Sequence, residues 1–179
     1  MGKLTQELIL DTTEKLIYEF GMDKTTLNDI AKRLNVSHPA LYKHFLNKEE
    51  LFQKLAWRWL EETSKNLFNW TKSTISTRQN LHDWLWLLAS TKKTLFEKDQ
   101  RMFSLYTDYI ENNEELITIH LRHLAEKVSE ITGLDEGKGK AIITAFIYFH
   151  NPYFANQWDR PNYKVLFEDT FCLLDITIS

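Results

Sequence analysis

Segment 37–45 carries side chains that an ordinary protein core would not use. If the segment is helical, Leu41 and Phe45 share one face and belong in a core. The rest of the surface offers hydrogen-bonding groups, an aromatic ring and a positive charge, from His38, Pro39, Tyr42, Lys43 and His44. Such groups on a helix suit hydrogen bonds to base edges and contacts with thymine methyl groups in a DNA major groove.

The charge distribution favours an anionic partner at the same place. The formal net charge of −3 argues against nucleic acid if it is spread evenly. It is not spread evenly, because residues 24–48 carry one acidic side chain, Asp29, against five basic ones: Lys24, Lys32, Arg33, Lys43 and Lys48. An acidic body with one basic strip predicts a chain that binds DNA at one end.

Capping residues mark the starts of the helices around this segment. Thr26 followed three residues later by Asp29 is a capping-box pattern, and Asn47 followed by Glu50 repeats it. Leu46 and Leu51 flank the second start at the spacing of a hydrophobic staple. The spacing predicts a helix from Thr26 and a long helix that begins after Asn47.

A short turn is expected between residues 34 and 38. Asn35 closes the helix from Thr26, because asparagine tolerates the left-handed backbone of a tight turn. Ser37 is expected to cap the following helix, and Pro39 falls in its first turn, where a missing N–H costs little. Residues 26–45 therefore predict a helix-turn-helix unit, whose second helix would enter the major groove.

The remaining pattern is helical throughout. An amphipathic helix is expected over 4–20, ended by Gly21, and further helices around 81–88, 102–110 and 116–131. A loop over 133–139 precedes two helices, 141–154 and 163–178, that are apolar nearly all round. The fold class is therefore all-α, with a DNA-binding domain over 1–47 and a second helical domain over 48–179.

The stretch 25–52 resembles the TetR family of transcriptional regulators. It reads TTLNDIAKRLNVS, continues through ALYKHF over 40–45 and ends in NKEELF over 47–52. The resemblance covers about residues 4–60. Asn35, where the family has glycine, and Thr13, where it has alanine, are departures that leave the assignment standing.

The resemblance implies roles for the matched residues. Thr25 and Thr26 would hold a DNA phosphate at a helix N-terminus, and Tyr42 and Lys48 would grip further phosphates. The residues that would lie in or beside the groove and read the bases are Ser37, His38, Pro39, Ala40, Lys43 and His44.

The second domain is expected to dimerise and to sense a ligand. Two helices that are apolar all round must be covered, and the family implies a four-helix dimer interface, for which we expect Phe149, Tyr153, Phe167, Phe171 and Leu174. The family also implies a cavity, for which the candidates are Trp84, Leu88, Phe103, Tyr106, Phe146 and His150. Plain core is an equally good interpretation of these six.

The sequence gives little support for a catalytic site or a metal site. No Gly-rich phosphate loop or recognisable nucleophile–base pair is present, so we expect no enzyme and no cofactor. His120 and His123 have a spacing that can bind metal, but no partner ligand accompanies them and no metal is expected. Cys172 is interpreted as a small core residue.

The sequence thus predicts a cytoplasmic, ligand-responsive repressor. No secretory signal or membrane-spanning run is evident, and one cysteine cannot form an internal disulfide. A homodimer would bind a palindromic operator in double-stranded DNA, and a small apolar or aromatic effector would release it. The alternative is the same fold gated by a protein partner instead of a small molecule.

Overall fold

A computed structural model of the chain describes residues 3–73 and 75–174, and among these every regular element is helical. The predicted all-α fold is confirmed. The chain forms two compact units, one of residues up to Glu62 with Asp99–Asn113, the other of Thr63–Lys98 with the residues from Glu114 onward. The division therefore falls inside a helix, and the predicted functional boundary at residues 47 and 48 stays a prediction.

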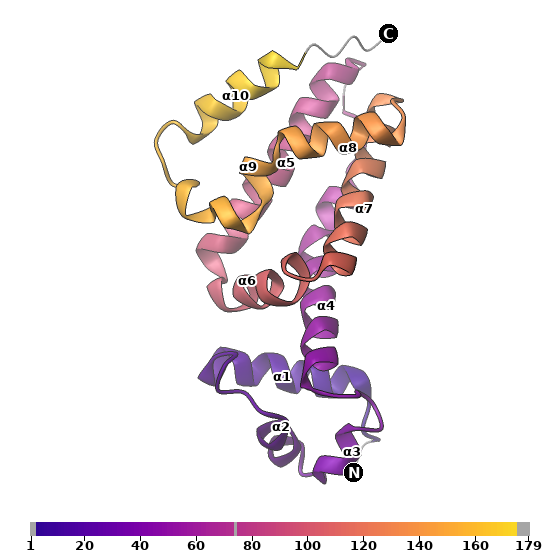
Figure 1. The fold of residues 1–179 in the computed structure, drawn as a ribbon, viewed down its shortest axis with the longest axis vertical. Coiled ribbons are helices and arrows are strands. Elements are labelled where there is room, and N and C mark those ends of the chain that lie inside the picture. Colours follow the sequence, from indigo (N-terminus) through magenta and orange to yellow (C-terminus); the bar gives the residue numbers. More distant parts are fainter. Residues whose placement is uncertain (1–2, 74, 175–179) are drawn as a thin grey trace. The chain divides into compact units, whose positions relative to one another are not determined.

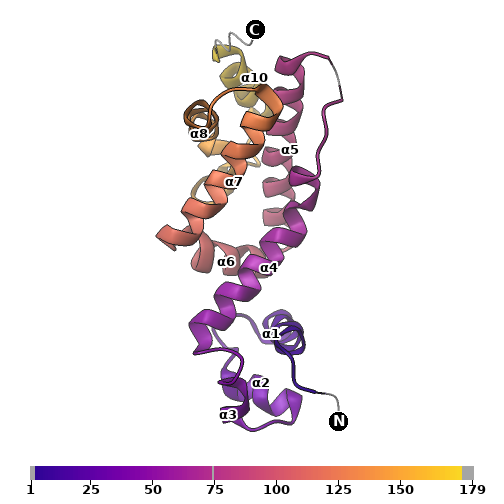
Figure 2. The ribbon, with the colours of Figure 1, turned by 90° about the vertical axis from the view of Figure 1, so that its right-hand side faces the viewer.

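The first unit is built around three N-terminal helices (Figure 1). These are α1 (Gln6–Phe20), α2 (Leu27–Leu34) and α3 (His38–Leu41), followed by the start of α4 (Lys48–Phe68). Farther along the chain, α6 (Gln100–Tyr106) and the π-helical turn η1 (Thr107–Glu111) return to this unit. In Figures 1 and 2, α2 and α3 lie together at one end of the unit beside α1.

Local chemistry explains where these helices begin and end. Gly21 ends α1 with a φ of 89°, a backbone that glycine adopts without strain. At α2, Thr26 and Asp29 form the predicted capping box, and Asn35 adopts the left-handed backbone, with φ 53° and ψ 46°. Ser37 precedes α3, but its side chain makes no capping hydrogen bond. The capping predictions are confirmed except for that of Ser37.

Two predictions about the region 37–51 are wrong in detail. The helix predicted over 37–45 is α-helical only over His38–Leu41, and turns complete the segment. Asn47 accepts a hydrogen bond from the Glu50 N–H at 2.8 Å, as the repeated capping pattern predicts. Leu46, however, is 79% exposed, so it does not make the predicted staple with the buried Leu51.

Within the described residues, the second unit contains five helices and one 3-10 turn after the end of α4. They are α5 (Thr77–Lys98), α7 (Glu114–Thr132), α8 (Glu136–Ala145), α9 (Ile147–His150), the 3-10 turn η2 (Pro152–Gln157) and α10 (Tyr163–Leu173). The helix predicted over 141–154 is broken at Phe146, and α9 ends at His150, before the Asn151-Pro152 pair. Part of the helix predicted over 163–178 lies outside the described residues.

The loop predicted over 133–139 is shorter than expected, because Asp135 caps α8 by accepting a hydrogen bond from the Lys138 N–H. Gly139 then lies inside α8, where that helix crosses α7. A Cβ at Gly139 would lie 2.6 Å from the Ala125 carbonyl oxygen and 2.7 Å from the Ser129 Oγ. This glycine therefore permits the close approach of the two helices.

Gly139→Ala is expected to lower the free energy of unfolding by about 1–3 kcal/mol, because the backbone carbonyl of Ala125 cannot easily move away. Gly137→Ala is the matched control. Its Cβ would meet only the Asp135 side chain, at 3.1 Å, so a change of less than about 1 kcal/mol is expected. Chemical denaturation of both variants measures the difference, and equal stabilities would contradict the close-packing role of Gly139.

Candidate DNA-binding surface

The surface of α3 divides as the sequence predicts. Leu41 and Phe45 are buried in the core of the first unit. On the other side the structure leaves exposed Ser37, His38, Pro39, Tyr42 and Lys43, while Ala40 and His44 are half-buried. The His38 and Tyr42 rings make an edge-to-face contact, with their centroids 5.3 Å apart. Charged, aromatic and hydrogen-bonding groups are thus presented together by α3 and the turn that follows it, residues 37–44.

Three features fix this helix in place. The left-handed Asn35 sets the turn, and the Val36 N–H donates to the Ala31 carbonyl at 3.0 Å. Leu41 and Phe45 anchor the buried side. At the far end, the Gln6 side chain on α1 donates to the His44 carbonyl at 3.0 Å, a contact that sequence reasoning missed. A rigidly held helix can present its side chains to a groove at small entropic cost.

The start of α2 differs from the prediction for Thr25. This residue is 1% exposed, its hydroxyl donates to the Gly21 carbonyl at 2.8 Å, and its N–H donates to the Met22 carbonyl. Both donors therefore hold the turn that leads into α2, and neither is available to a phosphate. The exposed Thr26 is engaged as well, since its hydroxyl donates to the Asp29 carboxylate at 2.5 Å.

The capping box shapes the electrostatics of this helix start. The hydrogen bond from the Thr26 hydroxyl, followed by that from its N–H, lowers the pKa of Asp29, so the carboxylate stays charged. Helix geometry leaves the N–H groups of Leu27 and Asn28 without intrahelical acceptors, and Asn28 is exposed. These two backbone groups, which sequence reasoning did not single out, are the donors that remain for an anion at α2.

The basic strip is only partly available for a partner. Arg33 makes a two-pronged ion pair with Glu19, at 2.8 and 2.6 Å. Lys48 is the first residue of α4, and its ammonium lies 4.7 Å from the centroid of the Phe52 ring. Lys24, Lys32 and Lys43 are exposed. Of the five basic side chains, the arginine is thus neutralised by an ion pair, and the four lysines can bind phosphates.

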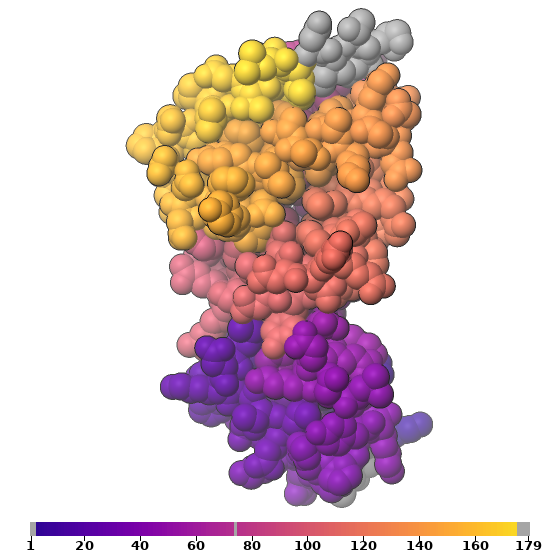
Figure 3. Space-filling view, viewed as in Figure 1, coloured from indigo at the N-terminus to yellow at the C-terminus, as the bar shows by residue number. Residues whose placement is uncertain are grey.

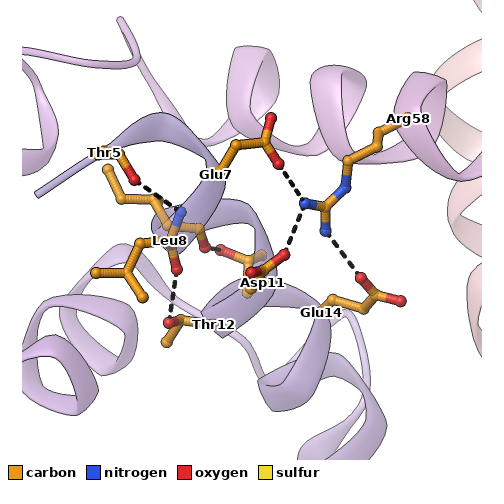
Figure 4. Close-up of polar contacts among 9 residues, drawn as sticks. Thr5, Glu7, Leu8, Asp11, Thr12, Glu14 and Arg58 are labelled. Carbon is orange, nitrogen blue, oxygen red and sulfur yellow. Dashed lines mark hydrogen bonds and ion pairs between the residues drawn. The ribbon is translucent and has the colours of Figure 1, made fainter.

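One arginine ties α4 to α1 inside this unit (Figure 4). The Arg58 guanidinium is 17% exposed and contacts three carboxylates, those of Glu7 at 3.0 Å, Asp11 at 2.7 Å and Glu14 at 2.8 Å. The three acids recur at helical spacing along one face of α1, which is visible in the sequence, but nothing there indicates their shared partner. This clamp fixes the helix that carries Lys48 against the rest of the unit.

The six cavity candidates divide between the two units. Trp84, Leu88, Phe146 and His150 are buried in the second unit, where the Trp84 indole N–H donates to the Leu67 carbonyl at 2.9 Å. Phe103 and Tyr106 belong to the first unit, with their ring centroids 5.8 Å apart. There the Tyr106 hydroxyl donates to the Glu111 carboxylate.

Four basic side chains of the second unit are buried within the described residues, Lys92, His120, Lys127 and His150, and sequence reasoning selected His150 as a cavity candidate. His150, the expected one, donates from Nε2 to the Ile143 carbonyl at 3.1 Å, and burial lowers its pKa to about 4. His120 and Lys92 are also buried. Burial, followed by the charge of Lys92, lowers the pKa of His120 well below its usual value. Both histidines are therefore neutral at pH 7, and His120 lies in the core of the second unit.

The predicted dimer residues take two different positions. Phe149, Phe167 and Phe171 are buried in an aromatic cluster of their own chain, with the Phe167 ring 5.3 Å from Phe149 and 4.9 Å from Trp86. They have almost no surface to give to a partner. Tyr153 is exposed and Leu174 is half-buried. The exposed apolar side chains nearby, which sequence reasoning did not select, are Ile147, Val165, Leu166 and Leu173.

Cys172 is exposed, so its interpretation as a core residue is wrong; it lies on the outer side of α10. Within the described residues no cluster of three or more metal-ligating side chains occurs. No helix in the same part of the chain is long and apolar enough to cross a membrane.

Comparison with protein families gives two matches. Residues 9–55 match the model described as bacterial regulatory proteins of the tetR family, and residues 77–170 match the tetracyclin repressor-like C-terminal domain. Together they include α2, α3 and the start of α4, and most of the second unit.

Relatives and solved structures agree with these matches. The chain is 30% identical over 122 residues to IcaR, the HTH-type negative transcriptional regulator of the biofilm operon icaADBC in Staphylococcus epidermidis, covering 68% of this chain and 62% of that protein. It is 45% identical over 71 residues to the probable acrEF/envCD operon repressor of Escherichia coli K12, covering 36% and 31%. A structure of BioQ with its DNA operator aligns with a TM-score of 0.60 at 18% identity, covering 94% and 96%.

Proposed function

Because the chain belongs to the tetR family of bacterial regulatory proteins, we propose that it is a transcriptional regulator that binds DNA through residues 25–48. The chain spans 62% and 60% of the length of two of its curated relatives. The activity proposed for it therefore depends on its own residues and not on theirs. The observation that carries the proposal is the anchored segment of α3 and the turn after it, whose outer side bears exposed charged and aromatic groups.

The geometry supports specific roles for the residues of this surface. Lys48, Tyr42 and the N–H groups at the start of α2 are proposed to hold phosphates, with Thr26 ordering that helix start. The groups proposed to meet base edges are Ser37, His38, Pro39, Ala40, Lys43 and the half-buried His44. Thr25 is not among them, because its hydroxyl and N–H hold the turn before α2.

The DNA is proposed to be bound by a homodimer on a palindromic operator. The second unit carries apolar side chains on its exposed surface, among them Tyr153, Val165 and Leu173, which a second copy would cover. In the space-filling view, residues 140–174, coloured orange to yellow, form a continuous surface on one face of this unit (Figure 3). A two-fold dimer would present two copies of α3 to half-sites about one helical turn apart or somewhat more.

A small apolar or aromatic effector is proposed to release the DNA. Trp84, Leu88, Phe146 and His150 remain the candidates within the second unit. Since the His150 Nε2–H is engaged with Ile143, its Nδ1 would accept a hydrogen bond from the effector. Thermal-shift screening with aromatic compounds tests this, because a ligand of the folded state raises the melting temperature. A screen without stabilising compounds would favour gating by a protein partner instead.

We propose that the protein acts in the cytoplasm, where the DNA is, and that it catalyses no reaction. Regulation by a dimer requires only that the effector binds the two arrangements of the DNA-binding units with different affinity. Selection of binding sites from random duplexes tests the whole proposal. An enriched palindrome is expected, and a pool that stays random would overturn it.

Lys48→Ala is expected to weaken binding to all duplexes alike and to flatten the salt dependence by about one unit per subunit, because it removes one phosphate contact. Lys65→Ala, which removes an exposed lysine farther along α4, is the matched control. Fluorescence anisotropy titrations at several salt concentrations measure both. If Lys48→Ala changed the preferred sequence and kept the affinity, the assignment of Lys48 to a phosphate would be wrong.

A further inference from the structure

A pocket of about 350 Å³ opens on the second unit between α5 and the chain that leads into α10. Its aromatic lining includes Trp86 and Tyr163, and its charged lining consists of Lys93, Asp159, Arg160 and Lys164. None of these residues belongs to the DNA-binding surface or to the proposed effector cavity. Three cations against one carboxylate make the pocket attractive to an anion.

The aromatic walls are held firmly. The Tyr163 hydroxyl donates to the Phe149 carbonyl at 3.2 Å, and the Trp86 and Phe167 rings make an edge-to-face contact with their centroids 4.9 Å apart. The rings of Trp86 and Tyr163 lie 6.2 Å apart, inclined at 47°. The indole N–H of Trp158, which also lines the pocket, donates to the Tyr148 carbonyl at 2.7 Å. These contacts fix the position of the Trp86 ring, against which a flat ring could pack once Lys164 moves aside.

The cations fall into two groups. Lys93 is neutralised, because its ammonium contacts the Asp159 carboxylate, the Glu97 carboxylate at 2.9 Å and the Trp158 carbonyl at 2.7 Å. Lys164 is exposed and its ammonium lies 5.4 Å from the centroid of the Trp86 ring. Arg160 is exposed too, and within the described residues no hydrogen bond or ion pair engages its guanidinium. Lys164 and Arg160 are thus the cations available to a ligand.

From this arrangement we infer that the pocket binds a small aromatic carboxylate. The aromatic ring lies on the Trp86 face that the Lys164 ammonium now covers, and the carboxylate accepts hydrogen bonds from Arg160 and from the displaced Lys164. Arg160 suits this task because a guanidinium binds a carboxylate through two parallel hydrogen bonds. The volume is close to the lower end of the range for small-molecule sites, which favours a ligand of one or two fused rings. This inference does not depend on DNA binding.

Calorimetric titration of the full chain with 1-naphthoate tests the inference, with 1-naphthamide and acetate as comparators. The naphthoate is expected to bind at least about tenfold more tightly than either, because the amide lacks the charge and acetate lacks the ring. Equal binding of naphthoate and naphthamide, or no binding of naphthoate at millimolar concentration, would overturn the inference.

Substitutions of the lining residues test whether the ligand binds in this pocket. Arg160→Gln is expected to weaken naphthoate binding about tenfold or more, and Lys164→Gln to weaken it less. Arg122→Gln, which changes an exposed arginine on α7, is expected to bind as the wild type does. All three side chains are exposed, so the melting temperatures should stay near that of the wild type. Unchanged binding in both the Arg160 and Lys164 variants would show that the site lies elsewhere.

Discussion

Phe167→Asp is expected to unfold the second unit, whereas Leu173→Asp is expected to leave it folded and to turn the proposed dimer into monomers. Phe167 is 0% exposed and its ring packs against Phe146, Phe149 and Trp86. A carboxylate there loses those contacts and buries a charge without a partner, a loss of more than about 4 kcal/mol.

Leu173 lies on the same helix, α10, but is 85% exposed. Replacing it by aspartate removes no packing within one chain, so the melting temperature of an isolated chain should change little. At a two-fold interface, however, each new carboxylate would be pressed against the other subunit. Both carboxylates would have to be desolvated, which disfavours the dimer. The expected outcome is a folded monomer.

Circular dichroism together with sedimentation velocity separates the two effects. Phe167→Asp should lose helical signal, and Leu173→Asp should keep it while its sedimentation coefficient falls to that of a monomer. A Leu173→Asp protein that sediments as the wild type does would mean that α10 does not pack against a second copy at this residue. A folded Phe167→Asp protein would contradict the aromatic core.

Sequence reasoning succeeded where local chemistry decides the structure. The capping box of Thr26 and Asp29, the left-handed Asn35 and the glycine at the end of α1 each depend on a few neighbouring residues, and each is present. The division of α3 into a buried side with Leu41 and an exposed side also follows from helical periodicity alone. The fold class and the position of the candidate surface could therefore be predicted.

Contacts between distant segments could not be predicted in the same way. The shared partner of the acidic stripe on α1 is Arg58, which comes 44 positions after Glu14. The Gln6 contact with the end of α3 and the turn contacts of Thr25 are equally invisible in the local pattern. A threonine before a helix suggests a phosphate contact, but its neighbours decide whether the hydroxyl is free.

The C-terminal helices show a further limit. Residues that are apolar all round a helix indicate that it is covered on every side, but they do not tell which side meets the chain itself. In α10 the phenylalanines face their own unit, while Val165 and Leu173 face outward. Cys172 is exposed for the same reason, since it lies on the outward side. The apolar pattern correctly predicted that Phe167 is buried, but its own chain buries it and not a second subunit.

The second large effect is expected at α3. Replacing both His38 and Lys43 by alanine removes exposed groups that no core contact requires, so folding should be unaffected. Each base contact contributes about 1–3 kcal/mol of discrimination, and a dimer loses every contact twice. The affinity for the selected operator should therefore fall by on the order of 1000-fold or more. The affinity for unrelated DNA should fall far less, because phosphate contacts dominate it.

The ratio of these two affinities tests the central claim most directly. It is measured by titrating the wild type and the His38→Ala/Lys43→Ala variant with the selected operator and with a scrambled duplex of equal length, at one salt concentration. For the wild type we expect a ratio of about 10³ or more, and for the variant a ratio that approaches one. A variant that keeps the wild-type ratio would contradict the assignment of base reading to α3, and a wild type without preference would contradict sequence-specific binding altogether.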